Sequence, residues 1–566
     1  IKVEVPESWK TAEDEIVEKE IKTDRPEMKK FVKEILSPID HQKGDTIPVS
    51  TFVDMASGVF PAGSSAFEKR GIAVDVPEWD PTKCAQCNRC AMVCPHAVIR
   101  PVALTADELA AAPANTKAVD LKVPKDSGLK YALIISTLDC TGCASCANVC
   151  PTKSLTMKPI ASQLDSQPVF DALCDIDPKA EVASDKTVVS TQYLKPYLEF
   201  SGACAGCGET PYAKLATQLF GDKMYIANAT GCSSIWGGSA PSTPYTVDKH
   251  GNGPAWSNSL FEDNAEFGLG MFLAQAQIRS RLAEDAIALK ETSVGKEVQD
   301  YLDTFHSTRG NDAPAKALIS AIENTEFDGE AKAAAEDFLK DKDYAAKKSQ
   351  WIFGGDGWAY DIGFGGLDHV LAQNQDLNVL VFDTEVYSNT GGQASKSTPT
   401  GAVAQFAASG KITKKKDLAK IAMSYGYIYV AQVAMGADYN QCLKAMKEAE
   451  AYNGPSLVIC YAPCINHGIK MPFNQAEQKK AVEAGYWNLF RFNPALVEEG
   501  KNPFSLDSKA PTSDYIEFIN GETRYSALRR SFPEKADKLF NIAAENAVQK
   551  YNDLLRTVEY YAPKKD

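Results

Sequence analysis

The sequence lacks long apolar runs, an excess of basic charge and an apolar leader. Its longest apolar stretches, such as Leu377–Phe382 and Ser456–Cys460, are far shorter than the ~20 residues of a membrane-spanning helix, so we expect no membrane insertion. Sixty Lys and Arg residues stand against 74 Asp and Glu residues, a formal charge of −14, which argues against nucleic-acid binding as the main function. The chain begins at Ile1 and continues with charged residues, so we expect no secretion signal and a cytoplasmic protein.

What remains is ordinary globular composition with an unusual number of cysteines. Of 566 residues, 44% are hydrophobic and 24% are charged, which is typical of a folded chain of about three or four domains. There are 15 cysteines, and an odd number argues against a fully paired disulfide framework. Their spacing therefore decides their role.

The pattern C-x2-C-x2-C-x3-C-P starts at Cys84 and again at Cys140, 56 residues further on. This is the bacterial ferredoxin pattern, in which the fourth cysteine of each copy binds the other cluster. We expect that fourth cysteine to lie at the start of a helix. A pair of zinc sites fits less well, because zinc is usually held by two C-x2-C pairs, often with histidine. His96 follows only one C-P pair and is expected at the surface or behind the ligands.

The repeat thus predicts two 4Fe–4S clusters. The first cluster site is Cys84, Cys87, Cys90 and Cys150, and the second cluster site is Cys140, Cys143, Cys146 and Cys94.

A third set of cysteines is less regular. Cys204 and Cys207 lie in GACAGCGET, and Cys232 lies in ATGCSSIWGG. The glycines on both sides allow the backbone to approach a bulky inorganic group. By themselves these residues could form a redox pair, half a zinc site or half a cluster site.

One late cysteine could complete this set. Cys442 lies in a helical pattern and Cys460 ends an apolar strand, and burial as a small hydrophobe explains both. Cys464 follows Pro463 in a loop just beyond that strand, where ligands of α/β sheets bind, so we choose Cys464. Cys174 stands alone and is expected to have no ligand role.

Two buried strands farther along the chain end in polar loops. Trp351–Phe353 leads into the sequence GDG at Asp356, and Leu377–Phe382 leads into Thr384, 28 residues later. Parallel neighbouring strands would bring both loops to one sheet edge. A carboxylate, a hydroxyl and a nearby main-chain oxygen suit a magnesium ion that holds a diphosphate.

This spacing resembles the thiamine-diphosphate motif, although most members of that superfamily have Asn where this chain has Thr384. Together with the two ferredoxin repeats and the third cysteine set, it resembles the pyruvate:ferredoxin oxidoreductase family, from about Asp80 to the C-terminus. The resemblance implies an α/β fold: a parallel-sheet thiamine-diphosphate domain with an inserted α+β ferredoxin-like domain.

The resemblance also assigns residues. It implies a third 4Fe–4S cluster on a third cluster site, which is Cys204, Cys207, Cys232 and Cys464. It implies magnesium bound by Asp356, Thr384 and the main-chain oxygen of Val386. It places Glu209 and Cys232 beside the thiamine, Ile235 as the prop of the bent cofactor and Asn389 facing the substrate as a catalytic residue. The remaining cofactor-lining residues would be Gly355, Gly357, Trp358, Glu385, Tyr387 and Ser388, with Asp356, Thr384, Val386 and Asn389.

The activity implied is oxidation of pyruvate with coenzyme A as co-substrate to acetyl-CoA and CO2. Single electrons would pass through the three clusters to ferredoxin or flavodoxin. The pyrimidine-binding and coenzyme A domains would be supplied by an N-terminal half, in a homodimer of whole enzymes. Alternatives are another 2-oxo acid (2-oxoglutarate, a branched-chain acid or oxalate), a pure electron-transfer subunit, or an iron-free decarboxylase, which the ferredoxin cysteines disfavour.

The expected organisation has five parts. Residues 1–75 end a preceding domain and include a small linking domain, with helices over Glu13–Ile21 and Pro26–Leu36. Residues 76–165 form the ferredoxin-like domain, 166–190 a polar linker, 191–495 the thiamine-diphosphate domain and 496–566 a helical end. Strands are expected at Met224–Asn228, Trp351–Phe353, Leu377–Phe382, Ile428–Val433 and Leu457–Tyr461. A solvated helical insertion should occupy Gln275–Lys348, and the basic run Lys414–Lys416 should be a solvated helix start.

Overall fold

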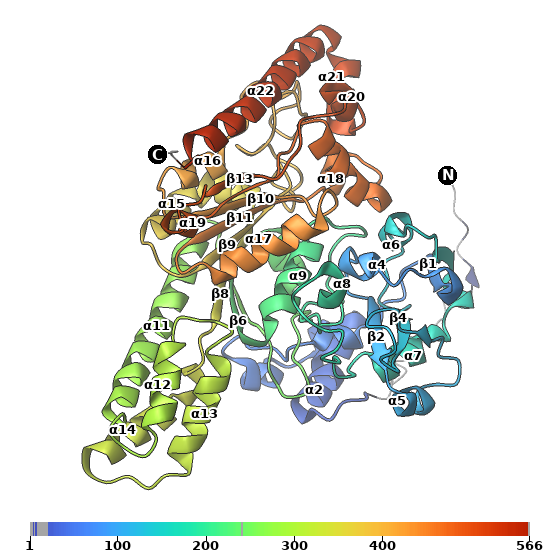
Figure 1. The fold of residues 1–566 in the computed structure, drawn as a ribbon. Helices are drawn as coiled ribbons and strands as arrows, with labels where there is room; N and C mark the ends of the chain where they lie inside the picture. Colours follow the sequence, from blue (N-terminus) through green and yellow to red (C-terminus); the bar gives the residue numbers. More distant parts are fainter. Residues whose placement is uncertain (1–3, 5, 8–20, 239–241, 564–566) are drawn as a thin grey trace.

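The computed structural model describes residue 4, residues 6–7, residues 21–238 and residues 242–563. Along the chain it forms a small helical N-terminal part, a ferredoxin-like domain, a large sheet domain with a helical arm, and a helical C-terminal end (Figure 1). The two smaller parts lie beside one end of the large sheet, and the arm extends away from it.

The N-terminal part is a helix followed by short turns. The helix consists of α2 (Pro26–Phe31), a π-helical turn η1 (Val32–Leu36) and α3 (Ser37–Asp40). Pro26 occupies the first helical position, where its missing N–H costs nothing. Phe31 meets the ring of Phe60 edge-on at 5.8 Å between centroids, and the buried face forms a small core of its own. The helix expected over Glu13–Ile21 lies, except for Ile21, outside the described residues.

The ferredoxin-like domain is built from two small antiparallel sheets. One pairs β1 (Asp75–Trp79) with β5 (Leu155–Pro159), and the other has the order β2-β4-β3. The members of the second sheet are β2 (Ile99–Leu104), β3 (Val119–Asp120) and β4 (Lys130–Ile135). α5 (Ala106–Ala111) follows β2 and begins with a capping box at Thr105. This is an α+β arrangement in which the first and last strands close the domain.

Each ferredoxin repeat contains one very short helix, α4 (Arg89–Met92) or α6 (Ser145–Val149). The third cysteine of each repeat, Cys90 or Cys146, lies within this helix. The fourth cysteine, Cys94 or Cys150, follows the helix and precedes a Pro-containing turn. The expectation that the fourth cysteine starts a helix is therefore wrong: Pro95 and Pro151 come too soon after the preceding helix, and only a turn follows.

The segment expected as a polar linker is folded onto this domain. It contains α7 (Ser166–Leu173) and α8 (Val188–Thr191). Phe170 and Leu173 belong to the hydrophobic core of the ferredoxin-like domain, and Phe170 packs edge-on against Phe200 at 5.9 Å. The apolar positions of this segment are spaced for a helix, and they are buried.

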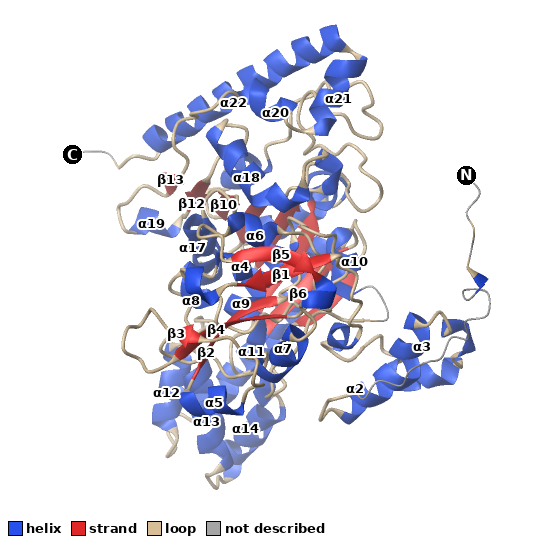
Figure 2. Ribbon diagram, turned by 90° about the vertical axis from the view of Figure 1, so that its right-hand side faces the viewer, coloured by secondary structure: helices blue, strands red, loops and turns tan. Residues whose placement is uncertain are grey.

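The large domain is an eight-stranded sheet with the order β13-β12-β10-β11-β9-β8-β6-β7 (Figures 1 and 2). The strands from β10 to β7 are parallel to their neighbours, and β12 and β13 are antiparallel additions at one edge. The five expected strands are present as β6 (Met224–Ala229), β8 (Ser349–Gly355), β9 (Asn378–Asp383), β10 (Tyr429–Val433) and β11 (Ser456–Tyr461). Three strands were not expected: β7 (Ala255–Ser259), β12 (Phe490–Phe492) and β13 (Phe504–Leu506).

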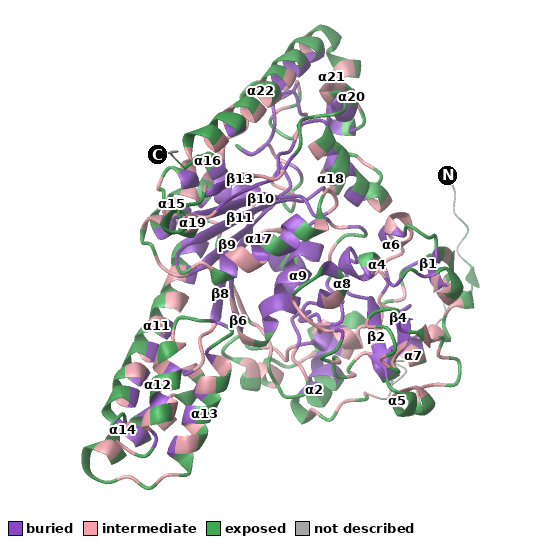
Figure 3. Cartoon of the chain, in the orientation of Figure 1, coloured by how far each residue is buried: buried purple, intermediate pink, exposed green. Residues whose placement is uncertain are grey.

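Both faces of this sheet are covered, which is why its central strands are continuously apolar. In β9, Val379 and Val381 enter the core on one face, and Leu380 and Phe382 enter the core on the other. One face carries α9 (Thr210–Phe220), α10 (Cys232–Gly238) and α17 (Tyr439–Ala451), and the opposite face carries α15 (Phe364–Ala372), α16 (Leu418–Met423) and α18 (Asn474–Glu483). The sheet is accordingly among the most buried parts of the molecule (Figure 3).

The arm is inserted between β7 and β8. It comprises α11 (Asn264–Ala288), α12 (Gly295–Asp303), α13 (Asp312–Glu323) and α14 (Gly329–Lys340), with a separate hydrophobic core. The expected helical insertion is present but starts earlier, because α11 first packs along the sheet, where Ala265 joins the main core.

The C-terminal part returns to the sheet before it becomes helical. After α19 (Ala495–Glu498), β13 completes the sheet edge, and α20 (Tyr515–Asn520), α21 (Thr523–Ser531) and α22 (Pro533–Tyr560) follow. Leu539 and Phe540 of α22 belong to the core of the large domain. Within the described part of the chain, no helix combines the length and apolar character that a bilayer crossing demands.

Candidate functional site

A cavity of about 350 Å³ lies beyond the ends of β6, β8 and β9. These strands are parallel neighbours, so their carboxyl ends meet at one edge of the sheet. The lining residues are Glu209, Thr230, Gly231, Cys232, Ser233, Phe261, Gly355, Asp356, Gly357, Trp358, Val386, Tyr387, Ser388, Asn389 and Thr390. Ten of the residues predicted to surround a cofactor are thus brought to one place.

Three predicted residues do not line this cavity. Ile235 lies on α10 with 46% of its surface exposed. Thr384 lies behind the wall, between Asp356 and Val386. Glu385 turns its side chain away from the cavity, as described below.

The predicted magnesium-binding oxygens are adjacent. Thr384 donates from its main-chain N and from Oγ1 to Asp356 Oδ1, at 3.1 and 3.0 Å. Thr384 Oγ1 is also 3.0 Å from the main-chain oxygen of Val386. A carboxylate, a hydroxyl and a carbonyl oxygen at such spacing are a hard-oxygen set that fits magnesium, with diphosphate oxygens free to complete the octahedron. Ser395, which the sequence did not single out, donates from Oγ to Asp356 Oδ2 at 2.6 Å and orients the carboxylate.

Glycine is required in the GDG turn for space. A Cβ on Gly357 would come within 2.5 Å of the ring of Tyr387, so a side chain here would displace a cavity wall. Gly355 has open space around the corresponding position, which leaves room for a ligand to approach the backbone. A π-helical turn, η9 (Gly357–Ile362), starts directly after Asp356.

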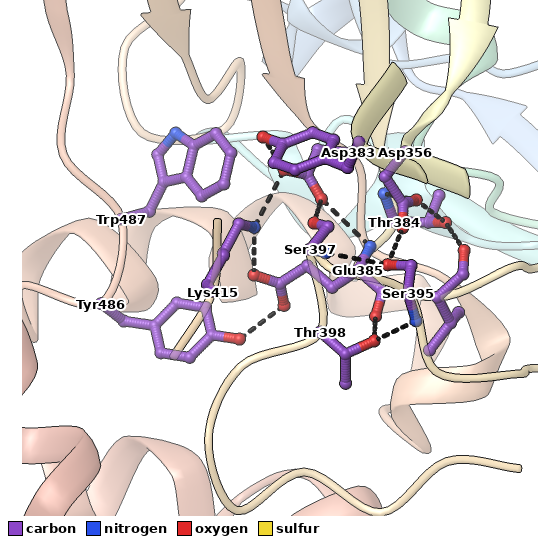
Figure 4. A network of polar contacts seen from close by, with 12 residues as sticks. Asp356, Asp383, Thr384, Glu385, Ser395, Ser397, Thr398, Lys415, Tyr486 and Trp487 are labelled. Atoms are coloured by element: carbon purple, nitrogen blue, oxygen red, sulfur yellow. Dashed lines mark hydrogen bonds and ion pairs between the residues drawn. The ribbon is translucent and has the colours of Figure 1, made fainter. Parts of the chain in front are cut away.

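Behind the predicted magnesium-binding oxygens lies a buried network of charges (Figure 4). Glu385 has φ of 61° and is 1% exposed, and its carboxylate accepts from Lys415 Nζ at 2.9 Å, Arg524 Nη2 at 2.7 Å and Tyr486 Oη. Lys415 also pairs with Asp383 at 2.9 Å. These cations outweigh burial and hold the pKa of Glu385 at about 2. Lys415 is therefore not part of a solvated helix start. The ion pairs of Glu385 anchor the turn that follows β9, on the side away from the cavity.

His467 joins this turn to the next loop. Its Nε2 lies 2.8 Å from the main-chain oxygen of Thr384, and the ring is fully buried. Burial lowers the pKa of His467 to about 3, so the neutral ring donates its Nε2 proton to that oxygen. His467 closes the turn η10 (Ile465–His467), which begins directly after Cys464.

Glu209 and Cys232 form the opposite wall of the cavity. Glu209 Oε2 accepts from Trp236 Nε1 at 2.7 Å, and burial raises the pKa of Glu209 to about 7. Cys232, the first residue of α10, has its Sγ 3.1 Å from Ser388 Oγ. A carboxyl group that can hold a proton near neutral pH thus faces the site.

The cysteines of the third cluster site lie close together beside this wall. Burial, then Glu209, raises the pKa of Cys232, and Cys207 and Cys464 raise it further. Cys204 and Glu209 likewise lie close enough to Cys464 to raise its pKa. The two loops touch, because a Cβ on Gly208 would fall 2.5 Å from the main-chain oxygen of Pro463. Cys442 and Cys460 are instead fully buried in the hydrophobic core.

The ferredoxin cysteines cross over between the repeats. Burial raises the pKa of Cys90, and Cys87, Cys84 and Cys150 raise it further. Burial also raises the pKa of Cys146, with added effects of Cys143, Cys94 and Cys140. Each fourth cysteine therefore lies with the three cysteines of the other repeat.

The thiols of the second cluster site lie around a cavity. A cavity of about 320 Å³ is lined by Cys94, Cys140, Cys143 and Cys146. Among the described residues, no group of three or more potential ligands is close enough to hold a single metal ion. In all three sites a main-chain N–H donates at 3.4 Å to the sulfur two residues earlier, from Gln86 to Cys84, Gly142 to Cys140 and Glu209 to Cys207. Such bonds stabilise a cluster-bound thiolate.

His96 lies between the second and third cluster sites. It is 3% exposed, so of the two expected positions it takes the one behind the predicted ligands, and burial lowers its pKa to about 4. Its Nε2 donates to the main-chain oxygen of Ala203 at 2.9 Å, and Nδ1 lies 3.4 Å from Thr141 Oγ1. His96 therefore connects the loops that carry Cys140 and Cys204.

Comparisons with known proteins agree with this geometry. Residues 331–460 match a thiamine pyrophosphate enzyme C-terminal TPP binding domain, residues 76–99 and 133–156 each match a 4Fe-4S binding domain, and residues 15–73 match a domain of unknown function. The pyruvate:ferredoxin oxidoreductase of Moorella thermoacetica is 54% identical over 555 residues, covering 96% of this chain and 47% of that protein. The pyruvate-flavodoxin oxidoreductase of Klebsiella pneumoniae is 51% identical over 550 residues, with coverages of 96% and 46%.

Over 96% of its length the chain is thus similar to pyruvate:ferredoxin and pyruvate-flavodoxin oxidoreductases. It spans about half the length of these relatives. Thiamine diphosphate and 4Fe–4S clusters are the cofactors of its domains. The mitochondrial pyruvate dehydrogenase [NADP(+)] of Euglena gracilis is also 45% identical over 566 residues, covering 98% of this chain and 31% of that protein. A solved 2-oxoglutarate:ferredoxin oxidoreductase of Magnetococcus marinus matches at 17% identity with a TM-score of 0.28, covering 47% of this chain and 65% of that chain, a likeness too weak for a comparison of folds.

Proposed function

We propose that this chain is the cofactor-bearing half of an enzyme that oxidises pyruvate with coenzyme A. The balanced reaction is pyruvate plus coenzyme A to acetyl-CoA, CO2, one proton and two electrons. When bound, thiamine diphosphate supplies the electron sink for decarboxylation, and the clusters supply one-electron acceptors. The electrons leave for ferredoxin or flavodoxin. The observation that supports the proposal is that Glu209 and Cys232 line the cavity at the strand ends and that Cys232 also lies near Cys207 and Cys464.

The residues of this chain have distinct roles in the proposal. Asp356, Thr384 and the main-chain oxygen of Val386 hold magnesium, and Gly355 and Gly357 leave room for the diphosphate. The other predicted lining residues surround the thiamine: Glu209, Cys232, Trp358, Tyr387, Ser388 and Asn389.

The roles of Asn389 and Ile235 come from the resemblance to the family alone. Asn389 lines the cavity and faces the substrate. Ile235 is exposed on α10 and props the cofactor once the N-terminal half covers it. The pyrimidine-binding groups, the coenzyme A site and the substrate carboxylate site belong to that half.

The three cluster sites form the exit path for electrons. Cys204, Cys207, Cys232 and Cys464 hold the cluster beside the thiamine. His96 connects this third site to the second cluster site, and Cys94 of the second site lies only four residues after Cys90 of the first. The whole enzyme is a cytoplasmic homodimer in this proposal.

The test is an anaerobic dye-reduction assay of the native enzyme, containing both halves. Pyruvate, 2-oxoglutarate, a branched-chain 2-oxo acid and oxalate are each offered with and without coenzyme A. Rapid reduction with pyruvate that requires coenzyme A is expected. Preference for another acid would replace the substrate, and no reduction by any acid with thiamine diphosphate bound would leave an electron-transfer subunit.

A matched pair of variants ties the activity to the site. Asp356→Asn removes the carboxylate from the magnesium-binding set and should abolish both activity and bound thiamine diphosphate, with iron content unchanged. Asp337→Asn, on the exposed side of α14, should behave as the wild type. Retention of thiamine diphosphate by Asp356→Asn would contradict the assignment.

A further inference from the structure

Lys214 is a lysine buried between the large sheet domain and the ferredoxin-like domain. It lies on α9, with 2% of its surface exposed. Its Nζ donates to the main-chain oxygens of Ala91, Met92 and Cys94, the last two at 3.0 and 3.2 Å. These oxygens are at the end of α4, in the ferredoxin-like domain.

The number of acceptors indicates the state of this amine. An ammonium group has three N–H donors, whereas a neutral amine has two donors and a lone pair. A lone pair would face a carbonyl oxygen, so three converging carbonyls fit the charged form. The geometry therefore places a full positive charge at this buried position.

In the described part of the chain, no carboxylate compensates this charge. Lys214 has no Asp or Glu within ion-pair distance among the residues that the structure describes. Arg100, a buried cation in the same domain, has such a partner in Glu199. A buried unpaired charge is costly, so Lys214 needs another negative neighbour.

The negative neighbours are cluster ligands. Lys214 Nζ donates to the main-chain oxygen of Cys94 itself and to that of Ala91, which directly follows Cys90. Cys90 belongs to the first cluster site and Cys94 to the second. One ammonium group thus lies beside ligands of both ferredoxin-type clusters.

We propose that Lys214 is a positioning residue that sets the reduction potentials of both ferredoxin-type clusters. This rests on the proposed function, because it requires clusters at the two sites. A reduced cluster carries one more negative charge than an oxidised one, and a fixed cation in a buried environment stabilises that charge. Lys214 therefore raises both potentials and eases electron acceptance from the third cluster.

Helix α9 sets the distance between the Lys214 ammonium group and the thiamine cavity. Glu209, the residue before α9, lines the thiamine cavity, and Lys214 lies on the second turn of the same helix. One helix thus has Glu209 of the thiamine cavity at its start and Lys214 beside the two ferredoxin-type cluster sites on its second turn. The third cluster site is not among the groups that Lys214 contacts.

The test is a redox titration of the anaerobically purified holoenzyme, followed by electron paramagnetic resonance. Lys214→Met and Lys214→Gln remove the charge, and Gln retains a hydrogen-bond donor. Both should shift the potentials of the two ferredoxin-type clusters to more negative values and leave the third cluster unchanged. Lys214→Arg keeps the charge and should keep the wild-type potentials.

Lys122 is the matched control. It is exposed, and its Nζ donates to the main-chain oxygen of Cys84, a ligand of the first cluster site, at 2.7 Å. Because water screens its charge, Lys122→Met should give a smaller shift that is confined to that cluster.

Iron content and cluster signals are measured first in every variant. Unchanged potentials in Lys214→Met and Lys214→Gln would overturn the proposal, and so would loss of clusters in both, which would indicate a structural role alone. Absence of ferredoxin-type cluster signals from the unmodified enzyme would instead overturn the proposed function.

Discussion

His467 donates its Nε2 proton to the main-chain oxygen of Thr384 at 2.8 Å. His467 lies three positions after Cys464, a predicted cluster ligand, and Thr384 is a predicted magnesium ligand. The loop with the predicted cluster ligand and the turn with the predicted magnesium ligand therefore share one buried hydrogen bond. A change at His467 should be felt at both cofactors.

We expect His467→Phe to weaken binding of thiamine diphosphate and magnesium. The substitution leaves the buried oxygen of Thr384 without a donor, a loss of about 1–3 kcal/mol, or roughly 5- to 150-fold in affinity. Calorimetric titration of the cofactor-depleted enzyme measures this. His467→Gln, which can still donate, should recover part of the loss, and His369→Gln on the exposed face of α15 should have none. Equal affinity in His467→Phe and wild type would show that this bond does not support the turn.

Cys150→Ser should disrupt the first cluster site although Cys150 lies in the second repeat. Its sulfur accepts from the main-chain N of Ser154 at 3.2 Å and lies among the groups that act on Cys90. Iron content should fall by roughly a third, because one of three clusters is lost or degraded. Cys174→Ser is the control and should retain all iron. If the signals of the second site disappeared and those of the first remained, the crossed assignment would be wrong.

Arg524→Met should destabilise the large domain. Arg524 is 4% exposed, and its guanidinium pairs with Glu385 at 2.7 Å and Glu522 at 2.6 Å. Removing it leaves two buried carboxylates short of a partner, which costs about 3–5 kcal/mol. Denaturant unfolding followed by tryptophan fluorescence measures the loss. Arg556→Met, which removes an exposed pair with Asp553, should cost less than about 1 kcal/mol, and similar losses in the two variants would contradict the role of the network.

Glu450 should make stability depend on pH. Burial raises its pKa above the ordinary 4.5, although Ser349 Oγ, Asn378 Nδ2 and Trp351 Nε1 all donate to its carboxylate. The folded state then holds this proton more tightly than the unfolded state. Its contribution to stability is therefore greatest below pH 4.5 and falls as the pH rises through the raised pKa.

Glu450→Gln should remove that fall. The melting temperature of the variant, relative to wild type, should rise between pH 5 and pH 8 in calorimetric scans. Glu498→Gln, at an exposed position, should differ from wild type by a constant amount. A constant difference for Glu450→Gln would mean that this carboxyl is ionised throughout the range.

The parallel core of the sheet could be predicted because each strand is a continuous apolar run, as in Leu377–Phe382. Strand β7 could not, since its sequence AWSNS is short and polar, and it forms only by pairing with β6. β12 and β13 have three residues each, too few for a periodic signal. The segment of α7 was read as a linker because its polar residues hid Phe170 and Leu173, which only the packing shows to be buried.

The candidate site was predictable where chemistry depends on spacing along the chain. Asp356 and Thr384 could be paired because parallel strands end at one edge. Ser395, His467 and Lys214 could not be found, since each acts across long sequence separations and belongs to no motif. Glu385 was expected to face the cofactor, but no sequence pattern reveals that φ of 61° turns its side chain toward Lys415 and Arg524.

Helix α9 has a consequence for how this chain can vary over evolutionary time. Glu209 and Lys214 are separated by about 7 Å of helical rise, and each added residue would rotate one relative to the other by about 100°. A single insertion between them would turn the lysine out of its cage of carbonyl oxygens, or the carboxyl group out of the cavity. The arm between β7 and β8, which has a core of its own, can lengthen or shorten freely. We therefore expect the number of residues between Glu209 and Lys214 to stay constant during evolution, even as the residues around α9 change.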